Sequence, residues 1–266
     1  MNVTFKIKEL DKKVSILLSK QVWPKNLGSS EYFNKTTQGE RFDDKLYSKV
    51  SSYLLPSVSS ILDIGAGEGK LAEKLMYENY EVTCVEPSVN RFSVLQDKQI
   101  SSVNCNFHEI NTTKTYDCLI LLRSIGIASK IGDQFSLFKT LQKILAMAKS
   151  QAIIISKAIE DKDYVPMEFQ SFGIFNKKPW VFHYDMLKLM QASVTLSFIS
   201  IEVDKPYSSI EDCIKKDFVH EDHSQVKKYL SKYSYYQNQK FYRKVRLMFP
   251  IVDLIMSEEL HERARA

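Results

Sequence analysis

The 266-residue sequence lacks the marks of several protein classes. Its four cysteines show no paired metal-ligand spacing, so we expect reduced core thiols rather than a disulfide or zinc framework. No apolar run approaches the length of a membrane span. The first such run, Val14 to Leu18, is short and follows Lys12 and Lys13, which does not fit a signal peptide. We therefore expect a cytoplasmic protein that does not contact a membrane.

Neither the charge of the sequence nor its potential metal ligands indicate a specific kind of site. The formal net charge of +5 permits nucleic acid or an acidic acceptor without favouring either, because dedicated nucleic-acid domains carry a dense basic face. The densest basic cluster lies beside Phe241 and Tyr242 and consists of Lys240, Arg243, Lys244 and Arg246. We interpret it as a solvated strand end, with an RNA contact as the alternative. His220 and His223 stand without a further ligand cluster, so we expect no metal site.

Glycine is scarce, and its distribution points to one turn. Three of the eight glycines lie within five residues, at Gly65, Gly67 and Gly69. They follow the apolar run 61–64, which is typical of a buried parallel strand. Glycines allow positive φ and carry no Cβ, so a ligand can lie against bare backbone N–H groups at the positive end of the next helix. Glu86 ends a second strand, where its carboxylate can accept hydrogen bonds from both hydroxyls of a ribose.

Spacing excludes two common nucleotide-binding motifs at this turn. A dinucleotide fingerprint starting at Gly65 needs glycine at position 70, which is Lys70. A phosphate-binding loop ending at Lys70 needs glycine at position 64 and Ser or Thr at position 71, but Ile64 and Leu71 stand there. A different nucleoside site must account for the pattern.

The remaining pattern resembles that of the class I S-adenosylmethionine-dependent methyltransferases. The residues that carry the resemblance are Asp63, Gly65, Gly67, Gly69 and Glu86. It covers about residues 59–203, and a structural glycine turn in another α/β protein is the alternative. The resemblance implies S-adenosylmethionine as the cofactor, with Ala66 and Pro87 joining these residues in its binding site.

The implied fold is an α/β fold with a seven-stranded, mostly parallel sheet and helices on both faces. We expect an N-terminal helical cap at 1–58, the cofactor-binding core at 59–204, a helical lid insertion at 205–240, and the last strand with the tail at 241–266. Apolar runs predict the third to seventh strands at 102–106, 116–122, 152–156, 194–203 and 241–249. Helices are expected at 91–96 and 134–149. Pro250 leaves two alternatives, a strand that continues past a bulge or a short helix.

Two strand ends supply further cofactor candidates. In the resembled family, residues after the third strand hold the adenine; here Asn106 replaces the usual aspartate and can still accept a hydrogen bond, while Phe107 can stack or donate its N–H. Arg123 and Ser124 follow the fourth strand, at the edge where ligands bind in open parallel sheets. Arg123 either contacts the cofactor or an anionic acceptor, or pairs with a neighbouring acid. The Asn/Asp-Pro-Pro-Tyr/Phe tetrapeptide of enzymes that methylate base exocyclic amines or glutamine amides is missing.

The flanking segments supply candidates by position alone. Tyr32 and Arg41 belong to the pre-sheet segment that covers the cofactor in the resembled family, where an arginine can pair with the methionine carboxylate. Tyr32 has an equally good alternative as a packing anchor. His183, near the expected acceptor site, is the candidate general base for a hydroxyl acceptor, against a plain surface or packing histidine.

The sequence thus predicts a methyltransferase that acts on a small-molecule O or N acceptor by in-line transfer. The aromatic loop 157–179 and the expected lid favour that acceptor class. Two alternatives stay open. One is an RNA or protein methyltransferase, and the other is a non-catalytic partner protein, which Asn106 and the lack of an obvious base motivate. The oligomeric state is not predicted.

Overall fold

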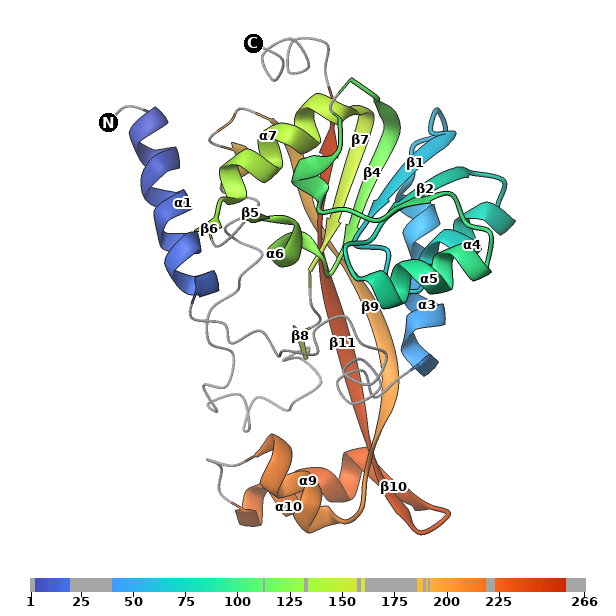
Figure 1. Cartoon of the computed structure of the whole chain (residues 1–266). Coiled ribbons are helices and arrows are strands. Elements are labelled where there is room, and N and C mark those ends of the chain that lie inside the picture. Colours follow the sequence, from blue (N-terminus) through green and yellow to red (C-terminus); the bar gives the residue numbers. More distant parts are fainter. Residues whose placement is uncertain are drawn as a thin grey trace. The chain divides into compact units, whose positions relative to one another are not determined.

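The computed structural model describes residues 3–19, 40–111, 113–131, 134–156, 159–160, 186–188, 190, 192–218 and 223–256 (Figure 1). The chain divides into two compact units. The first comprises Met1–Lys157, Pro179–Ser197 and Pro250–Ala266, and the second comprises Ala158–Lys178 and Phe198–Phe249.

The main sheet has nine strands within the described residues, so the prediction of seven is wrong in number. Five parallel strands form its first part: β3 (Ser102–Val103), β2 (Glu81–Val85), β1 (Ser60–Ile64), β4 (Tyr116–Leu122) and β7 (Ala148–Ile155), in this order. The long strand β11 (Lys240–Ile255) pairs antiparallel with β7. Three strands pair with β11: β8 (Ile159–Glu160), β9 (Ser193–Tyr207) and β10 (Ser234–Gln237). Within this sheet, the short β8 and β10 are the two strands that the sequence did not predict.

The strand order reverses between β1 and β4, and this reversal determines where a ligand can bind. From β1 the chain moves through α4 (Lys70–Tyr77) to β2, whereas from β4 it moves through α7 (Leu137–Met147) to β7 on the other side. Because such crossovers are right-handed, α4 and α7 lie on opposite faces of the sheet. The carboxyl ends of β1 and β4 diverge at this switch point, which is the usual ligand site of an open α/β sheet.

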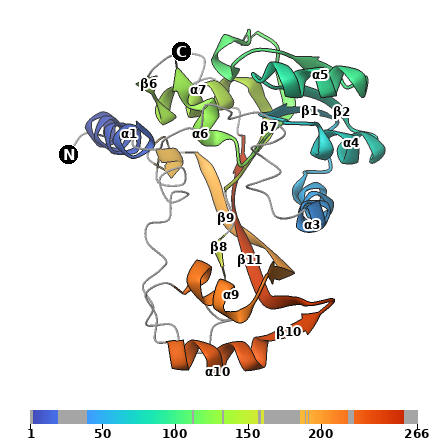
Figure 2. The same ribbon diagram turned by 60° about the horizontal axis from the view of Figure 1, so that its bottom comes forward.

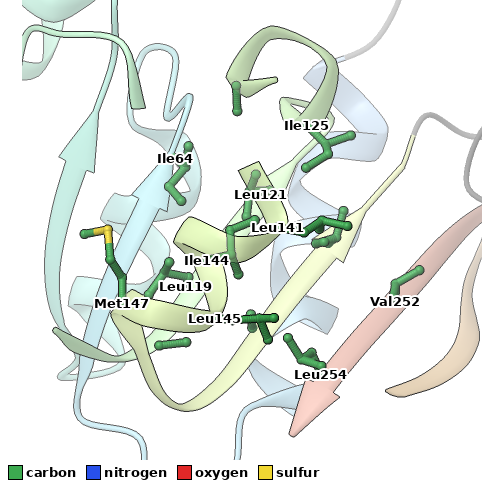
Figure 3. Packing of buried hydrophobic residues seen from close by; sticks show 14 of the residues in the cluster. Ile64, Leu119, Leu121, Ile125, Leu141, Ile144, Leu145, Met147, Val252 and Leu254 are labelled. Atoms are coloured by element: carbon green, nitrogen blue, oxygen red, sulfur yellow. The ribbon is translucent and has the colours of Figure 1, made fainter. Parts of the chain in front are cut away.

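The helix α7 and the sheet form the principal core. Leu141, Ile144 and Leu145 of α7 are fully or almost fully buried, and they pack with Leu119 and Leu121 of β4 (Figure 3). Alternate residues of β4 face α7, as the two-residue period of a strand requires. Burial of this many large aliphatic side chains, at about 1.5 to 3 kcal/mol each, stabilises the sheet edge that carries the site.

A second helical layer consists of α3 (Glu40–Val50), α4 and α5 (Val89–Asp97). Helix α3 contacts α4, α4 contacts β2, and α5 contacts β3. Each helix contributes fully or almost fully buried aliphatic side chains, namely Leu46, Val50, Leu71, Leu75 and Leu95. These contacts fix the start of α4, which directly follows the glycine turn.

The second unit contains α9 (Ile210–Asp217), α10 (His223–Tyr233) and the hairpin of β10 and β11 (Figure 2). Asn238 and Gln239 form the hairpin turn with positive φ angles of 49° and 60°, as tight hairpin turns require. The unit has its own core of Tyr207, Cys213, Ile214, Phe218, Val226, Leu230 and Phe241. The predicted insertion 205–240 thus contains two helices, and also strand residues at both ends.

Several predicted boundaries need correction. The third strand ends at Val103 rather than at residue 106, and residues 134–135 belong to β6 (Gln134–Phe135), which pairs with β5 (Lys130–Ile131). Helix α7 therefore starts at Leu137. The alternatives at Pro250 are resolved: β11 continues through Pro250, and residues 251–255 pair with β7. Shorter helical segments in the described part of the chain include α6 (Ile125–Ala128), η1 (Ser51–Tyr53) and η2 (Phe107–Glu109). None of the helices in the described ranges combines the length and apolar character needed to cross a membrane.

Helix α1 (Val3–Ser19) is attached to the core through Asp11. Asp11 Oδ1 accepts a hydrogen bond from the Phe138 backbone N–H at 3.0 Å, and Oδ2 accepts one from Ser136 Oγ at 3.1 Å. Ser136 is the N-cap of α7, and its side chain accepts from the Lys139 N–H. Asp11 therefore completes the cap of a helix distant in sequence, where a carboxylate also favours the positive helix end.

Replacing this carboxylate should loosen α1 from α7. We expect Asp11→Ala to lower the free energy of unfolding by about 1 kcal/mol, and the melting temperature by about 2 to 4 °C, because a capping interaction is lost. Glu9→Ala is the control, since Glu9 makes an exposed pair with Lys13 and its loss should change the free energy by less than about 0.5 kcal/mol. Equal effects of the two substitutions would contradict the capping role.

Candidate functional site

The turn after β1 has the backbone that its glycines predict. Gly65, Gly67 and Gly69 adopt positive φ angles of 73°, 61° and 80°. The Gly65 and Ala66 N–H groups both donate to the Val85 carbonyl, at 2.7 and 3.2 Å, which ties the turn to the end of β2. Gly69 is the N-cap of α4. The turn therefore places backbone N–H groups at a helix start, where anionic or polar ligand atoms are favoured.

Two of the three glycines are required by the protein's own packing. A Cβ on Gly65 would lie 2.6 Å from Ser124 Cβ, and a Cβ on Gly69 would lie 2.5 Å from Leu95 Cδ2. Both distances are far below van der Waals contact. Gly67 differs, because a Cβ there would meet, among the described residues, a single atom outside the turn within 4 Å, namely Arg91 Nη1 at 3.7 Å. The open face of the turn is therefore at Gly67.

Glu86 joins the two strand ends. Its Oε2 accepts the Gly67 N–H at 2.8 Å, and its Oε1 accepts the Ser88 N–H at 2.9 Å. The residue is 4% exposed, and its backbone carbonyl accepts from Asn104 Nδ2 at 2.8 Å. A carboxylate has about four lone-pair sites, so two acceptor positions remain after these two side-chain bonds. These two positions are enough to accept one hydrogen bond from each of the two hydroxyl groups of a ribose.

Asp63 is a buried carboxyl group beside the turn. It is 2% exposed, and its Oδ2 has no hydrogen-bond partner among the described residues. Burial, and then the negative charge of Glu86, raise the pKa of Asp63 to about 7. An orphaned buried oxygen is costly unless a bound group satisfies it, so Asp63 is a candidate to accept from, or donate to, a polar ligand atom.

The pKa shift of Asp63 makes stability depend on pH in a defined direction. Between its ordinary value of 3.8 and about 7, the folded protein keeps a proton that the unfolded chain releases. The free energy of unfolding therefore falls as the pH rises through this window. The asparagine of Asp63→Asn cannot ionise. We therefore expect the free energy of unfolding of the variant, relative to that of the native protein, to rise by about 3 to 4 kcal/mol from pH 4 to pH 8.

Urea unfolding at a series of pH values measures this difference. Asp117→Asn is the matched control, because the pKa of Asp117 is shifted in the opposite direction to that of Asp63. Burial raises the pKa of Asp117, but hydrogen bonds from Ser59 and Ser60 outweigh burial and hold that pKa below its usual range. Asp117→Asn should therefore lose stability relative to the native protein only as the pH rises towards the ordinary value of 3.8, and its difference from the native protein should stay nearly constant between pH 4 and pH 8. Parallel curves for Asp63→Asn and the native protein would show that Asp63 is ionised like an exposed carboxyl.

The end of β4 lies next to the glycine turn. Ser124 is 5% exposed, and its Oγ donates to the Ile64 carbonyl, directly before Gly65. Arg123 has a φ of +60°, which is uncommon for a residue with a side chain, and its N–H donates to the Ile155 carbonyl at 2.7 Å. The structure thus brings Arg123 and Ser124 to the switch point, as the sequence predicted.

The segment after β3 is fixed from α7 rather than from the sheet. Lys143 Nζ donates to the carbonyls of His108 and Ile110, at 2.8 and 2.7 Å, and lies 5.3 Å from the centre of the Phe107 ring. The Phe107 side chain is 3% exposed and belongs to the core, so its backbone N–H is better placed than its ring to meet an adenine. Asn106 is exposed, and its Nδ2 donates to Glu109 at 3.1 Å.

Some predicted site residues lie outside the described residues. Tyr32 and His183 are among them, and Arg41 is described only as a backbone position of α3. Ala66 and Pro87 lie in the two turns next to Gly67 and Glu86. In the described parts of the chain, no group of three or more potential metal ligands comes together; His220 is not in those parts.

Arg91 belongs to the site and was missed from the sequence. It lies in the first turn of α5, after the N-cap Ser88. Burial lowers the pKa of Arg91, whereas the charges of Glu86 and Glu68 raise it, so the guanidinium is within electrostatic reach of both carboxylates. A cation in the first turn opposes the helix dipole, and this was the signal available in the sequence.

Comparisons with known proteins find likeness in structure only. No family model and no curated protein matches the chain. The plantazolicin methyltransferase BpumL in complex with SAH has 17% identity and a TM-score of 0.46, over 94% of this chain and 98% of that one. The N-methyltransferase NodS from Bradyrhizobium japonicum, also in complex with SAH, has 10% identity and a TM-score of 0.45, over 94% and 99%. A putative methyltransferase from an antibiotic biosynthesis pathway of Anabaena variabilis has 16% identity and a TM-score of 0.45, over 77% and 96%. These similar structures are methyltransferases, the class that the sequence resembles.

Proposed function

We propose that this protein is a class I S-adenosylmethionine-dependent methyltransferase. The observation that carries the proposal is the geometry of Glu86, whose carboxylate is held by the N–H groups of Gly67 and Ser88 with two acceptor positions left for ribose hydroxyls. The orphaned Oδ2 of Asp63 and the open face of Gly67 lie at the same strand ends. The residues present therefore fit a nucleoside with a polar tail.

The proposed roles follow from these positions. The turn 65–69 holds the tail of the cofactor against bare backbone, Glu86 orients the ribose, and the Phe107 N–H with Asn106 meets the adenine. When bound, S-adenosylmethionine supplies a sulfonium-activated methyl group. The chain then has to fix the acceptor in line and exclude water, because the oxygen or nitrogen of the acceptor is itself the nucleophile and the thioether is the leaving group.

The acceptor is proposed to be a small molecule that presents an oxygen or a nitrogen. The aromatic composition of 157–179 supports this, although that segment lies outside the described residues. His183 is the proposed base for a hydroxyl acceptor, and Tyr32 and Arg41 are proposed cofactor contacts. Arg123, at the end of β4, is proposed to hold the cofactor carboxylate or an anionic group of the acceptor.

The ribose contact can be tested by binding of S-adenosylhomocysteine in a calorimeter. We expect Glu86→Gln to weaken binding about 10- to 100-fold, because an amide replaces one acceptor oxygen of a charged group with a donor. Glu81→Gln is the matched control, since Glu81 is an exposed residue at the opposite end of the same strand. Its affinity should equal that of the native protein. Failure of the folded native protein to bind would refute the proposed function.

One feature of the second unit favours RNA as a second candidate acceptor. Residues 223–249 contain seven Lys or Arg and no Asp or Glu. In the same stretch the Tyr235 and Tyr242 rings stack, with centroids 5.3 Å apart at 13°, and Lys244 Nζ lies 5.9 Å from the Tyr235 ring centre. Stacked aromatic rings beside lysines are a common platform for single-stranded nucleic acid.

Methyl transfer from labelled cofactor separates the two acceptors. We expect label in a small-molecule extract and none above background in RNA or protein fractions. Label in RNA that falls at least tenfold in the Tyr235→Ala, Tyr242→Ala double variant would replace the small-molecule proposal with the RNA one. Cofactor binding without transfer to any fraction would favour a non-catalytic partner role.

A further inference from the structure

The guanidinium of Arg91 borders the open face of Gly67. Arg91 Nη1 lies 3.7 Å from the position of a Cβ on Gly67, which is ordinary van der Waals contact. A ligand atom that rests on the bare face of Gly67 would therefore lie next to the guanidinium of Arg91.

The carboxylate that is proposed to bind the ribose also attracts Arg91. Glu86 and Glu68 are the carboxylates that act on the guanidinium. Two lone-pair positions of Glu86 are used by the Gly67 and Ser88 N–H groups, so a nearby cation and a pair of hydroxyls would have to share the remaining two. Attraction to Glu86 also offsets the unfavourable place of a cation in the first turn of α5.

We propose that Arg91 closes the ribose position in the ligand-free protein, and that nucleoside binding exchanges its attraction to Glu86 for hydrogen bonds between Glu86 and the ribose hydroxyls. Arg91 is then a determinant of cofactor affinity that acts by competition. The inference rests on the proposed function, because it takes the site over Gly67 to be a nucleoside site.

The size of the effect follows from the kind of ion pair. Pairs that are partly open to solvent contribute modestly, so releasing Arg91 should change affinity by about two- to tenfold. Salt screens such a pair, and the effect should shrink as ionic strength rises. These two features distinguish competition from a general loss of structure.

The test is calorimetric binding of S-adenosylhomocysteine at about 20 mM and about 300 mM NaCl, which span a large change in screening length. This ligand is suited to the test because it carries no net charge near neutral pH. We expect Arg91→Met to bind two- to tenfold more tightly than the native protein at low salt, with a smaller difference at high salt. Arg91→Lys keeps the charge and should remain close to the native protein.

Lys74→Met is the matched control, since Lys74 pairs with Glu78 on α4 and its removal lowers the charge by the same amount. It should leave the affinity unchanged at both salt concentrations. Thermal melting checks that each variant folds, and Arg91→Gln replaces Arg91→Met if the latter does not.

Three results have separate meanings. Weaker binding by Arg91→Met would show that the guanidinium contacts the ligand and would overturn the competition. Unchanged binding at both salt concentrations would also overturn it. Failure of the folded native protein to bind S-adenosylhomocysteine would instead refute the proposed function on which the inference rests.

Discussion

The carboxylate of Glu86 is the connection on which the candidate site depends. One of its oxygens holds the Gly67 N–H in the turn after β1, and the other holds the Ser88 N–H before α5. Its negative charge also helps to keep a proton on Asp63 and attracts Arg91. A single buried acid thus holds the backbone of the turn, adds to the effect of burial on the pKa of its neighbour and attracts the cation beside the turn.

The parts of this site that the sequence predicted are local in origin. Three alternate glycines predict a turn because few other residues tolerate repeated positive φ angles. All three glycines do adopt positive φ angles in the structure. The fourth strand was predicted with its observed bounds, 116–122, because a continuous apolar run between polar residues has few other structures. Arg123 and Ser124 follow, since the end of that strand determines their place at the switch point.

The missed features depend on contacts between distant segments. The strands β8 and β10 are short and are stabilised by pairing with β11, so composition alone does not reveal them. The continuation of β11 past Pro250 requires pairing with β7, which outweighs the missing N–H of proline. Arg91 was missed because its role arises from the approach of α5 to Gly67, and a basic residue in the first turn of a helix does not specify that approach.

The central claim is that the carboxyl ends of β1, β2 and β3 form a nucleoside site. Hydrogen exchange followed by mass spectrometry, with and without S-adenosylhomocysteine, tests it by locating the ligand along the chain. The account predicts slower exchange in peptides that cover residues 64–70, 86–91 and 104–108, where the turn and the two neighbouring strand ends lie. Protection confined to other segments, with these peptides unchanged at saturating ligand, would contradict it.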